Sequence, residues 1–303
     1  MRIVNLSYAA ILSAFFVLFC CAGCGGGSSS GALSSPADDY TGAETLDMTP
    51  PATTVKLMFI HHSTGSYWIR SGDNDPWGGL GRELNDNNFY VTESDYGWDA
   101  EIGDNLGDRT DTVNWPEWFN DTTMPYVYQN ASHFDYPDNT IADPGGENEI
   151  IMFKSCYPNS EVGDSIDDEK DIYNSLLSYF EAHADKMFVL IIPPPEITIS
   201  SAALTRELSN WLVDRDNGWL ADYAETNVYA FNYYNVLTDP NNHHWLNDGI
   251  EENIVSTDLI DPAHPDELYY PTGDSHPSSE GHQKATAEFV PLLIGWYNFW
   301  VNN

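Results

Sequence analysis

The chain has 303 residues, of which 42% are hydrophobic and 14% aromatic, which is enough for one sizeable core. It carries 47 acidic residues against 11 basic ones, so its formal net charge is −36. A field of this sign repels phosphate backbones and anionic lipid, which argues against nucleic acid as a partner. Because salt screens the self-repulsion, the composition favours a protein that works in saline surroundings.

The first 52 residues indicate export and a tether. Residues 1–24 contain the apolar stretch AAILSAFFVLF, which is too short to span a bilayer comfortably, followed by CAGC. This end resembles a bacterial lipoprotein signal in which Cys24 becomes the lipidated first residue, although Cys21 stands where that motif usually has Leu. An ordinary cleaved signal peptide is the alternative. Residues 25–52 indicate a flexible tether. We expect a protein of the cell envelope, held to the membrane only through its lipid, or else a secreted one.

Apolar runs that predict buried strands alternate with helical patterns over residues 53–303. The predicted strands are 55–60, 89–98, 148–153, 187–192 and 228–234. The predicted helices are 79–87, 169–186, 202–216 and about 279–301. Residues 99–147 indicate a loop-rich insertion over one face, with short helices near WPEWF. The alternation predicts an α/β fold, in which a parallel sheet is covered by helices on both faces.

Ser63 is the candidate nucleophile, because it directly follows the first predicted strand and so falls at the carboxyl edge of the sheet. A serine hydroxyl needs a neighbouring base and a group that orients the base. The segment GDSHPSSEGH offers both, since Asp274 lies two residues before His276 and the two can share one turn. Taken by itself, such a D-x-H segment is more often an ordinary capped turn.

In combination, these segments resemble the SGNH/GDSL hydrolase family. KLMFIHHSTG stands where that family has its strand and Gly-Asp-Ser block, FVLIIPPP resembles a later strand, and GDSHPSSEGH resembles the closing Asp/His block. The resemblance spans about residues 55–300 and implies a flavodoxin-like three-layer sandwich, a triad of Ser63, His276 and Asp274, and no cofactor. His61 and His62 replace Gly-Asp. Gly273 occupies the usual place of the aspartate, so the alternatives for that residue are Asp261 and Asp266.

The resemblance also implies donors for an oxyanion: the backbone N–H of the serine, a glycine N–H and an asparagine side chain. Gly97 fits the glycine position, with Gly103 as the alternative. Asn159 is the asparagine in the loop KSCYPNS, although by direct offset Ser155 or Cys156 would fall there.

Other folds and other kinds of catalytic or metal site fit the same sequence less well. The α/β-hydrolase fold ranks second, because its elbow is G-x-S-x-G and His61 stands at the first glycine. Cys156 beside Lys154 could be a nucleophile, but a small buried residue is the better interpretation. Adjacent histidines on an extended chain point to opposite sides, so we expect no metal. The Asp-rich loops lack EF-hand spacing for calcium.

Tryptophans surround the candidate site in the sequence, and aromatic faces suit sugar rings; they are Trp68, Trp77, Trp98, Trp115 and Trp118. The alternative for each is a place in the core. The sequence therefore predicts a serine esterase that hydrolyses an ester, with an O-acyl group on a carbohydrate as one substrate. The alternative, from another class, is a cell-surface binding lipoprotein on the same scaffold without turnover.

Overall fold

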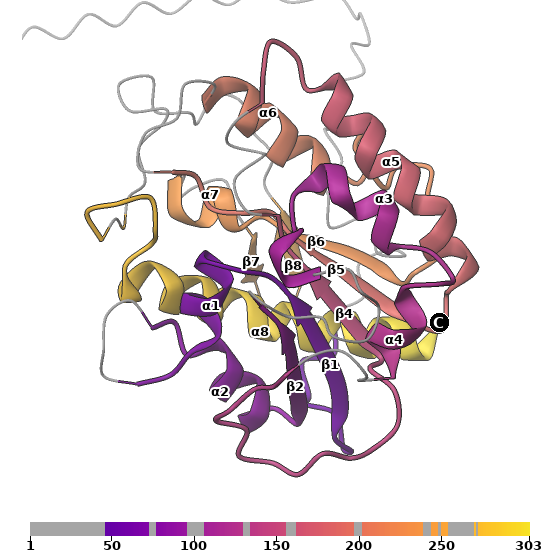
Figure 1. The fold of residues 1–303 in the computed structure, drawn as a ribbon, viewed down its shortest axis with the longest axis vertical. Helices are drawn as coiled ribbons and strands as arrows, with labels where there is room; N and C mark the ends of the chain where they lie inside the picture. Colours follow the sequence, from indigo (N-terminus) through magenta and orange to yellow (C-terminus); the bar gives the residue numbers. More distant parts are fainter. Residues whose placement is uncertain are drawn as a thin grey trace, which may run out of the picture. The chain divides into compact units, whose positions relative to one another are not determined.

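The structure is a computed structural model. It describes residues 46–72, 77–95, 106–129, 134–155, 162–196, 202–238, 244–247, 250–253, 270 and 272–303. The helices and strands of these ranges are drawn in Figure 1.

Five parallel strands form the described sheet. They are β1 (Val55–Ile60), β2 (Phe89–Ser94), β4 (Ile150–Phe153), β5 (Met187–Ile191) and β6 (Val228–Phe231). They lie in the order β2-β1-β4-β5-β6, and the two-residue strand β3 (Phe134–Asp135) pairs antiparallel with β2 at the edge. In chain order this is the 2-1-3-4-5 arrangement of flavodoxin-like sheets. The predicted parallel α/β sheet is confirmed.

The sheet is buried on both faces, which explains why its strands are nearly continuous apolar runs. One face meets α1 (Thr64–Ile69), α2 (Leu80–Asp86) and α8 (Ser279–Asn302). The other meets α3 (Trp115–Trp118), α4 (Met124–Tyr128), α5 (Asp167–Ala182) and α6 (Ala202–Val213). Figure 1 shows α8 running behind the sheet and α5 in front of it. The predicted strands and helices all form, with ends that shift by a few residues.

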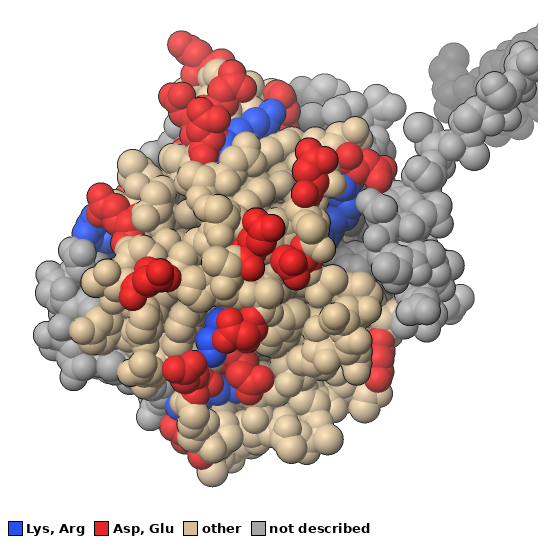
Figure 2. Space-filling view, turned by 90° about the vertical axis from the view of Figure 1, so that its right-hand side faces the viewer, with Lys and Arg blue, Asp and Glu red and all other residues tan. Residues whose placement is uncertain are grey.

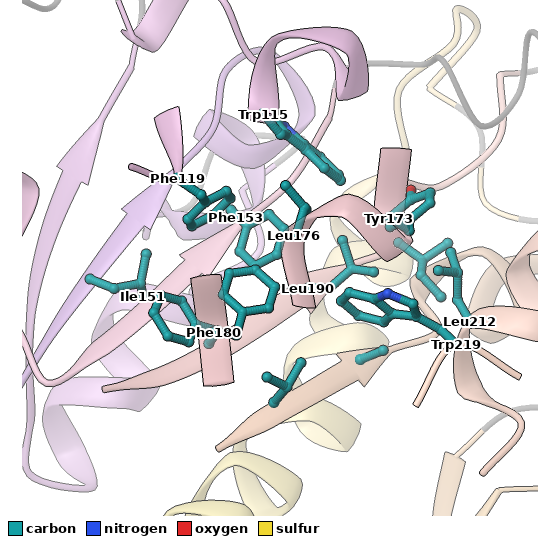
Figure 3. Close-up of a cluster of buried hydrophobic side chains, with 14 of the residues drawn as sticks. Trp115, Phe119, Ile151, Phe153, Tyr173, Leu176, Phe180, Leu190, Leu212 and Trp219 are labelled. Atoms are coloured by element: carbon teal, nitrogen blue, oxygen red, sulfur yellow. The ribbon is translucent and has the colours of Figure 1, made fainter. Parts of the chain in front are cut away.

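The residues described within the insertion 99–147 contribute to the core rather than only covering a face. Short 3-10 turns (Leu106–Asp108 and Thr112–Asn114) lead into α3 and α4. Phe119 lies in an aromatic cluster with ring centroids 5.0 Å from Phe153 and 4.9 Å from Phe180, and Figure 3 shows Trp115 and Phe119 over the sheet beside α5. This burial anchors the insertion, since aromatic side chains bury the largest apolar areas.

The burial of three tryptophans contradicts their interpretation as sugar-binding faces. Trp68, Trp115 and Trp118 are each at most 2% exposed. Trp68 packs between α1 and α8, and its indole N–H donates to Thr286 Oγ1 at 2.9 Å. The other interpretation, a place in the core, is confirmed for these three, as is usual for aromatic residues beside a sheet. Trp98 lies outside the described residues.

Several short elements were not predicted. They are α1, α7 (Tyr233–Thr238), the edge strand β3, and the antiparallel pair β7 (His244–Asn247) and β8 (Ile250–Asn253). The predicted strand 228–234 ends early because Asn232 begins a helix: its side-chain oxygen accepts from the backbone N–H of Asn235 at 2.9 Å. An asparagine is a preferred N-cap, so this boundary could be read from FNYY.

The described surface reflects the acidic composition. Figure 2 shows carboxylate groups spread over one face, with the few basic side chains lying close to acidic ones. Lys56 pairs with Asp143 at 3.1 Å and Lys186 with Glu147 at 2.8 Å. None of the helices in the described ranges has the length and apolar character needed to cross a bilayer.

Candidate active site

Ser63 stands at a sharp turn between β1 and α1. The backbone N–H of His61 still donates to Ser94 O of β2 at 3.0 Å, and the chain then turns into a helix, with Ser66 N donating to Ser63 O at 2.9 Å. Ser63 has φ 49° and ψ −108°, which is outside the regions that a residue with a side chain readily adopts. Such a conformation costs about 1–3 kcal/mol. The strained turn leaves the half-buried Ser63 at the carboxyl edge of the sheet.

The three residues of the predicted triad lie within hydrogen-bonding distance in series. Ser63 Oγ is 2.6 Å from His276 Nε2, although 213 positions separate them in the chain. His276 Nδ1 is 2.9 Å from Asp274 Oδ1. Both distances fall in the range expected of a nucleophile, its base and the group that orients the base.

The protonation of this series follows from Asp274. Hydrogen bonds from the His276 ring, from the His276 backbone N–H and from Thr272 hold the pKa of the Asp274 carboxyl below its usual value. The carboxylate is therefore ionised at neutral pH and can only accept. Nδ1 of His276 therefore donates to the carboxylate, and Nε2 is the ring nitrogen that faces Ser63 Oγ.

The base turn, residues 272–276, is built from short-range hydrogen bonds. Thr272 N donates to His276 O at 3.1 Å, and the backbone N–H of His276 donates to Asp274 Oδ1 at 2.9 Å. The Asp274 side chain is 69% exposed and that of His276 is 22% exposed. Ser278 then caps α8, accepting from Gly281 N at 3.4 Å. The D-x-H spacing thus sets the geometry of this turn locally.

An aromatic wall continues from the histidine. The Tyr67 ring lies edge-on to the His276 ring at 5.0 Å, and the half-buried Trp77 ring is 5.8 Å from Tyr67. Trp77 also lines a groove of about 850 Å³ between α2 and α8. Ser63, Asp274 and His276 are not among the residues that line this groove. Of the described tryptophans singled out in the sequence, Trp77 is the one that is not fully buried.

The histidine pair before Ser63 is buried. His61 Nε2 lies 3.2 Å from Glu93 Oε2. Burial, and then the Lys154 charge, lowers the pKa of His62 to about 4, so His62 is neutral at pH 7. Over the ranges that the structure describes, no three His, Cys, Asp or Glu side chains are grouped as metal ligands. The two rings are thus part of the interior beneath the nucleophile.

Several predicted site residues lie outside the described residues. They are Cys24, Gly97 and Asn159, together with the alternatives Gly103, Cys156, Asp261 and Asp266. Ser155 is described: it lies two residues after the end of β4, is fully buried, and its Oγ has no hydrogen-bond partner in the described part of the chain.

Sequence reasoning missed two residues that support the site, Glu93 and Thr272. Glu93 is an acidic residue in a strand that is otherwise apolar or neutral, FYVTES, and such a residue at the carboxyl end of a buried strand is itself a signal. Thr272 donates to Asp274 Oδ1 at 2.9 Å, and a hydroxyl two residues before the aspartate could have been noted.

Comparison of the chain with models of known protein families and with curated proteins found no match.

Proposed function

We propose that the protein is a serine ester hydrolase with Ser63 as nucleophile, His276 as general base and acid, and Asp274 as the residue that orients His276. The observation that carries the proposal is the continuous series of contacts, 2.6 Å from Ser63 Oγ to His276 Nε2 and 2.9 Å from His276 Nδ1 to Asp274 Oδ1. An ionised Asp274 and a strained nucleophile turn support the same reading.

The reaction has two acyl-transfer steps. Ser63 Oγ attacks the ester carbonyl carbon while its proton passes to His276 Nε2. The tetrahedral intermediate collapses, the bond to the alcohol oxygen breaks, and the alcohol leaves with the proton from Nε2. Water then attacks the acyl-serine ester and gives a proton to Nε2. The second collapse releases the carboxylic acid and returns the proton to Ser63 Oγ.

Catalysis by this route also needs hydrogen-bond donors for the oxyanion, since these are often the largest single contribution to the rate. The backbone N–H of Ser63 stands at the start of α1, next to the reacting oxygen. Gly97 and Asn159 are proposed as the other donors on the basis of the family resemblance.

The SGNH-like reading is preferred over an α/β-hydrolase. The parallel strands have the order 2-1-3-4-5, and the proposed acid and base share one short turn before the last helix. In an α/β-hydrolase the acid and base are far apart in the sequence. His61 and His62 depart from Gly-Asp but, being buried, do not obstruct Ser63 Oγ.

We propose an O-acyl group on a carbohydrate as the substrate class. The half-buried Trp77 supports this, because its ring lies 5.8 Å from Tyr67, which in turn lies against His276, and aromatic faces suit sugar rings. A screen of acetylated polysaccharides would test the substrate class separately from the chemistry.

The chemistry is tested by hydrolysis of p-nitrophenyl acetate. Ser63→Ala and His276→Ala should each lower kcat by about 10³-fold or more, because the triad acts as a unit. Ser66 provides a matched control: its hydroxyl, three residues from Ser63, donates to Asp95 Oδ2 at 2.8 Å. Ser66→Ala should retain kcat within a few-fold, by roughly the effect of one neutral hydrogen bond.

Full activity in Ser63→Ala would contradict this mechanism, and loss of activity in Cys156→Ser would favour a thiol nucleophile. A folded wild type that hydrolyses no ester would favour the binding lipoprotein on the same scaffold.

A further inference from the structure

A second series of charged and polar side chains lies behind Ser63 and takes no part in the proposed reaction. His61 Nε2 is 3.2 Å from Glu93 Oε2, and Arg70 Nη2 is 3.1 Å from the other carboxylate oxygen of Glu93, Oε1. The side chains of His61 and Glu93 are 0% and 2% exposed, whereas Arg70 is 28% exposed. Arg70 therefore leads from the interior to the surface.

A carboxylate as buried as Glu93 is unfavourable unless both of its oxygens are paired. Arg70 supplies a permanent positive charge and His61 supplies a ring N–H, because an ionised carboxylate can only accept. The Nδ1 atom of His61 is buried without a hydrogen-bond partner in the described residues. The Glu93 contact is thus the hydrogen bond that orients the His61 ring, which also packs against the Phe59 ring at 4.3 Å.

The positions of these residues in the chain give the series its significance. His61 precedes Ser63 by two residues, and Arg70 directly follows Ile69, the last residue of α1. One carboxylate on β2 therefore holds the chain on both sides of α1, the short helix that starts at Ser63. The ends of this segment are also held through the backbone, where Arg70 O accepts from Gly79 N at 2.7 Å.

The turn that Glu93 secures is strained, with φ 49° at Ser63. A strained residue with a side chain keeps its conformation only when its surroundings over-determine it. His61 also packs directly against α1, since a Cβ added at Gly65 would lie 2.5 Å from His61 Cβ. Movement of the His61 ring would therefore be passed to the first turn of α1.

We propose that Glu93 is a positioning residue for the nucleophile, which acts through His61 and Arg70 to keep Ser63 in the strained conformation that places Oγ against His276. This rests on the proposed function, because it assumes that Ser63 reacts. The wild type, Glu93→Ala, Glu93→Gln and Arg70→Ala are to be compared in p-nitrophenyl acetate hydrolysis and in the rate of labelling by a fluorophosphonate.

Glu93→Ala should lower kcat and the labelling rate by about 30-fold, since a small misplacement of a reacting group has effects of this order. KM should stay within about 2-fold, because the contacts that bind the ester are not removed. Glu93→Gln, whose amide oxygen still accepts from Arg70, should recover about a third or more of the lost rate. Arg70→Ala should lower kcat by about 5-fold. Because the Arg70 side chain is partly exposed, this variant should fold and can be measured even if Glu93→Ala does not fold.

Asn227→Ala is the control for a general loss of stability. Asn227 directly precedes β6, and its buried side chain donates at 3.0 Å to the carbonyl of Phe180 in the last turn of α5 and to that of Lys186 just before β5. We expect both Asn227→Ala and Glu93→Ala to unfold at a lower urea concentration than the wild type, but only Asn227→Ala to keep the wild-type kcat per folded molecule.

If the wild type is active and Glu93→Ala has the same kcat as Asn227→Ala, the positioning role of Glu93 is overturned, whereas the proposed function stands. A wild type that neither hydrolyses the ester nor reacts with the fluorophosphonate would overturn the proposed function and this inference together.

Discussion

The two halves of the candidate site are built in opposite ways. The nucleophile segment, residues 61–70, is mostly buried and is held by residues of β2, with His61 bound to Glu93 and to the backbone of Ser94. The base turn, residues 272–276, is largely exposed and is held by hydrogen bonds between residues two to four positions apart. One half depends on the assembled sheet, whereas the other depends on its own sequence.

This difference predicts how each half responds to change. A residue of the base turn can be altered with little effect on stability, because its hydrogen bonds compete with water at the surface. A residue of the nucleophile segment cannot, because its contacts are buried and closely packed. Variants of the base turn should therefore lose activity alone, and variants of the fully buried residues of the nucleophile segment should lose activity and stability together.

Apart from the loss of Ser63 or His276 themselves, the largest effect is expected for Asp274→Asn in the base turn. The amide keeps a similar shape but cannot stabilise the positive charge that develops on His276, and its NH2 group can donate to Nδ1, which leaves the ring hydrogen on Nε2. We expect kcat to fall by about 10²- to 10³-fold, less than for a buried aspartate because Asp274 is exposed to water. The urea midpoint should stay within error of the wild type. A variant that is both inactive and clearly less stable would contradict the local character of this turn.

The next effect is a pH dependence of stability that originates at His62. The His62 pKa is about 4 in the folded chain and near its ordinary value of 6.5 in the unfolded chain. Between these values the unfolded state binds more protons, so stability is lost as the pH falls from 6.5 to 4 and is unaffected by this group above 6.5. The loss is up to about 3 kcal/mol, since one pKa unit corresponds to about 1.4 kcal/mol.

The measurement for His62 is the free energy of unfolding in urea at several pH values for the wild type and His62→Gln. Glutamine does not titrate, so its curve should be flatter between pH 4 and 6.5. The two curves differ in slope whatever the substitution does to stability at pH 7. If the stability curves of the wild type and His62→Gln ran parallel, His62 would have the same pKa in the folded and the unfolded chain, and this prediction would be wrong.

A smaller effect on activity, accompanied by lost stability, is expected for Gly65→Ala in the nucleophile segment. The added Cβ would lie 2.5 Å from His61 Cβ, which forces a shift in a buried contact. Overpacking of this kind costs about 1–3 kcal/mol, and the same shift should lower kcat by about 10-fold because Ser63 is two residues away.

Gly163→Ala is the matched control for Gly65→Ala, because nothing lies within 4 Å of the Cβ it would add. Its kcat and urea midpoint should equal those of the wild type. If Gly65→Ala were as stable and active as this control, the tight packing of His61 against α1 would be unimportant for Ser63.

The smallest effect is expected for Thr272→Val. The change removes a hydroxyl that donates to Asp274 Oδ1 at 2.9 Å but leaves the two hydrogen bonds from His276 to the carboxylate. The pKa of Asp274 should rise slightly toward its ordinary value, because one donor to the charged form is lost. We expect kcat at pH 7 to fall by about 3-fold or less and stability to change by less than about 0.5 kcal/mol. A loss as large as that of Asp274→Asn would show that the hydroxyl orients the carboxylate.

The regular part of the fold was accessible from the sequence. The strand VKLMFI and the helix beginning at Ser279 follow from apolar runs, helical spacing and capping residues, which act over a few positions. Short elements such as α1 were missed, because six residues give too little periodic signal. For the tryptophans Trp68, Trp115 and Trp118 the sequence left both a core place and a sugar-binding face open, since a sequence does not state which face of an element is covered.

The sequence by itself determined the local half of the site. Because Asp274 and His276 are two residues apart, their hydrogen bond requires only one turn of chain, and the strand that precedes Ser63 places that serine at an edge of the sheet. Only the tertiary structure decided that Ser63 Oγ meets His276 Nε2 across 213 positions, and that Glu93 joins His61 to Arg70. These contacts form when the β2-β1-β4 order of the sheet and the packing of α1 bring distant segments together. Their geometry depends on the relative placement of whole elements, which no short stretch of sequence specifies.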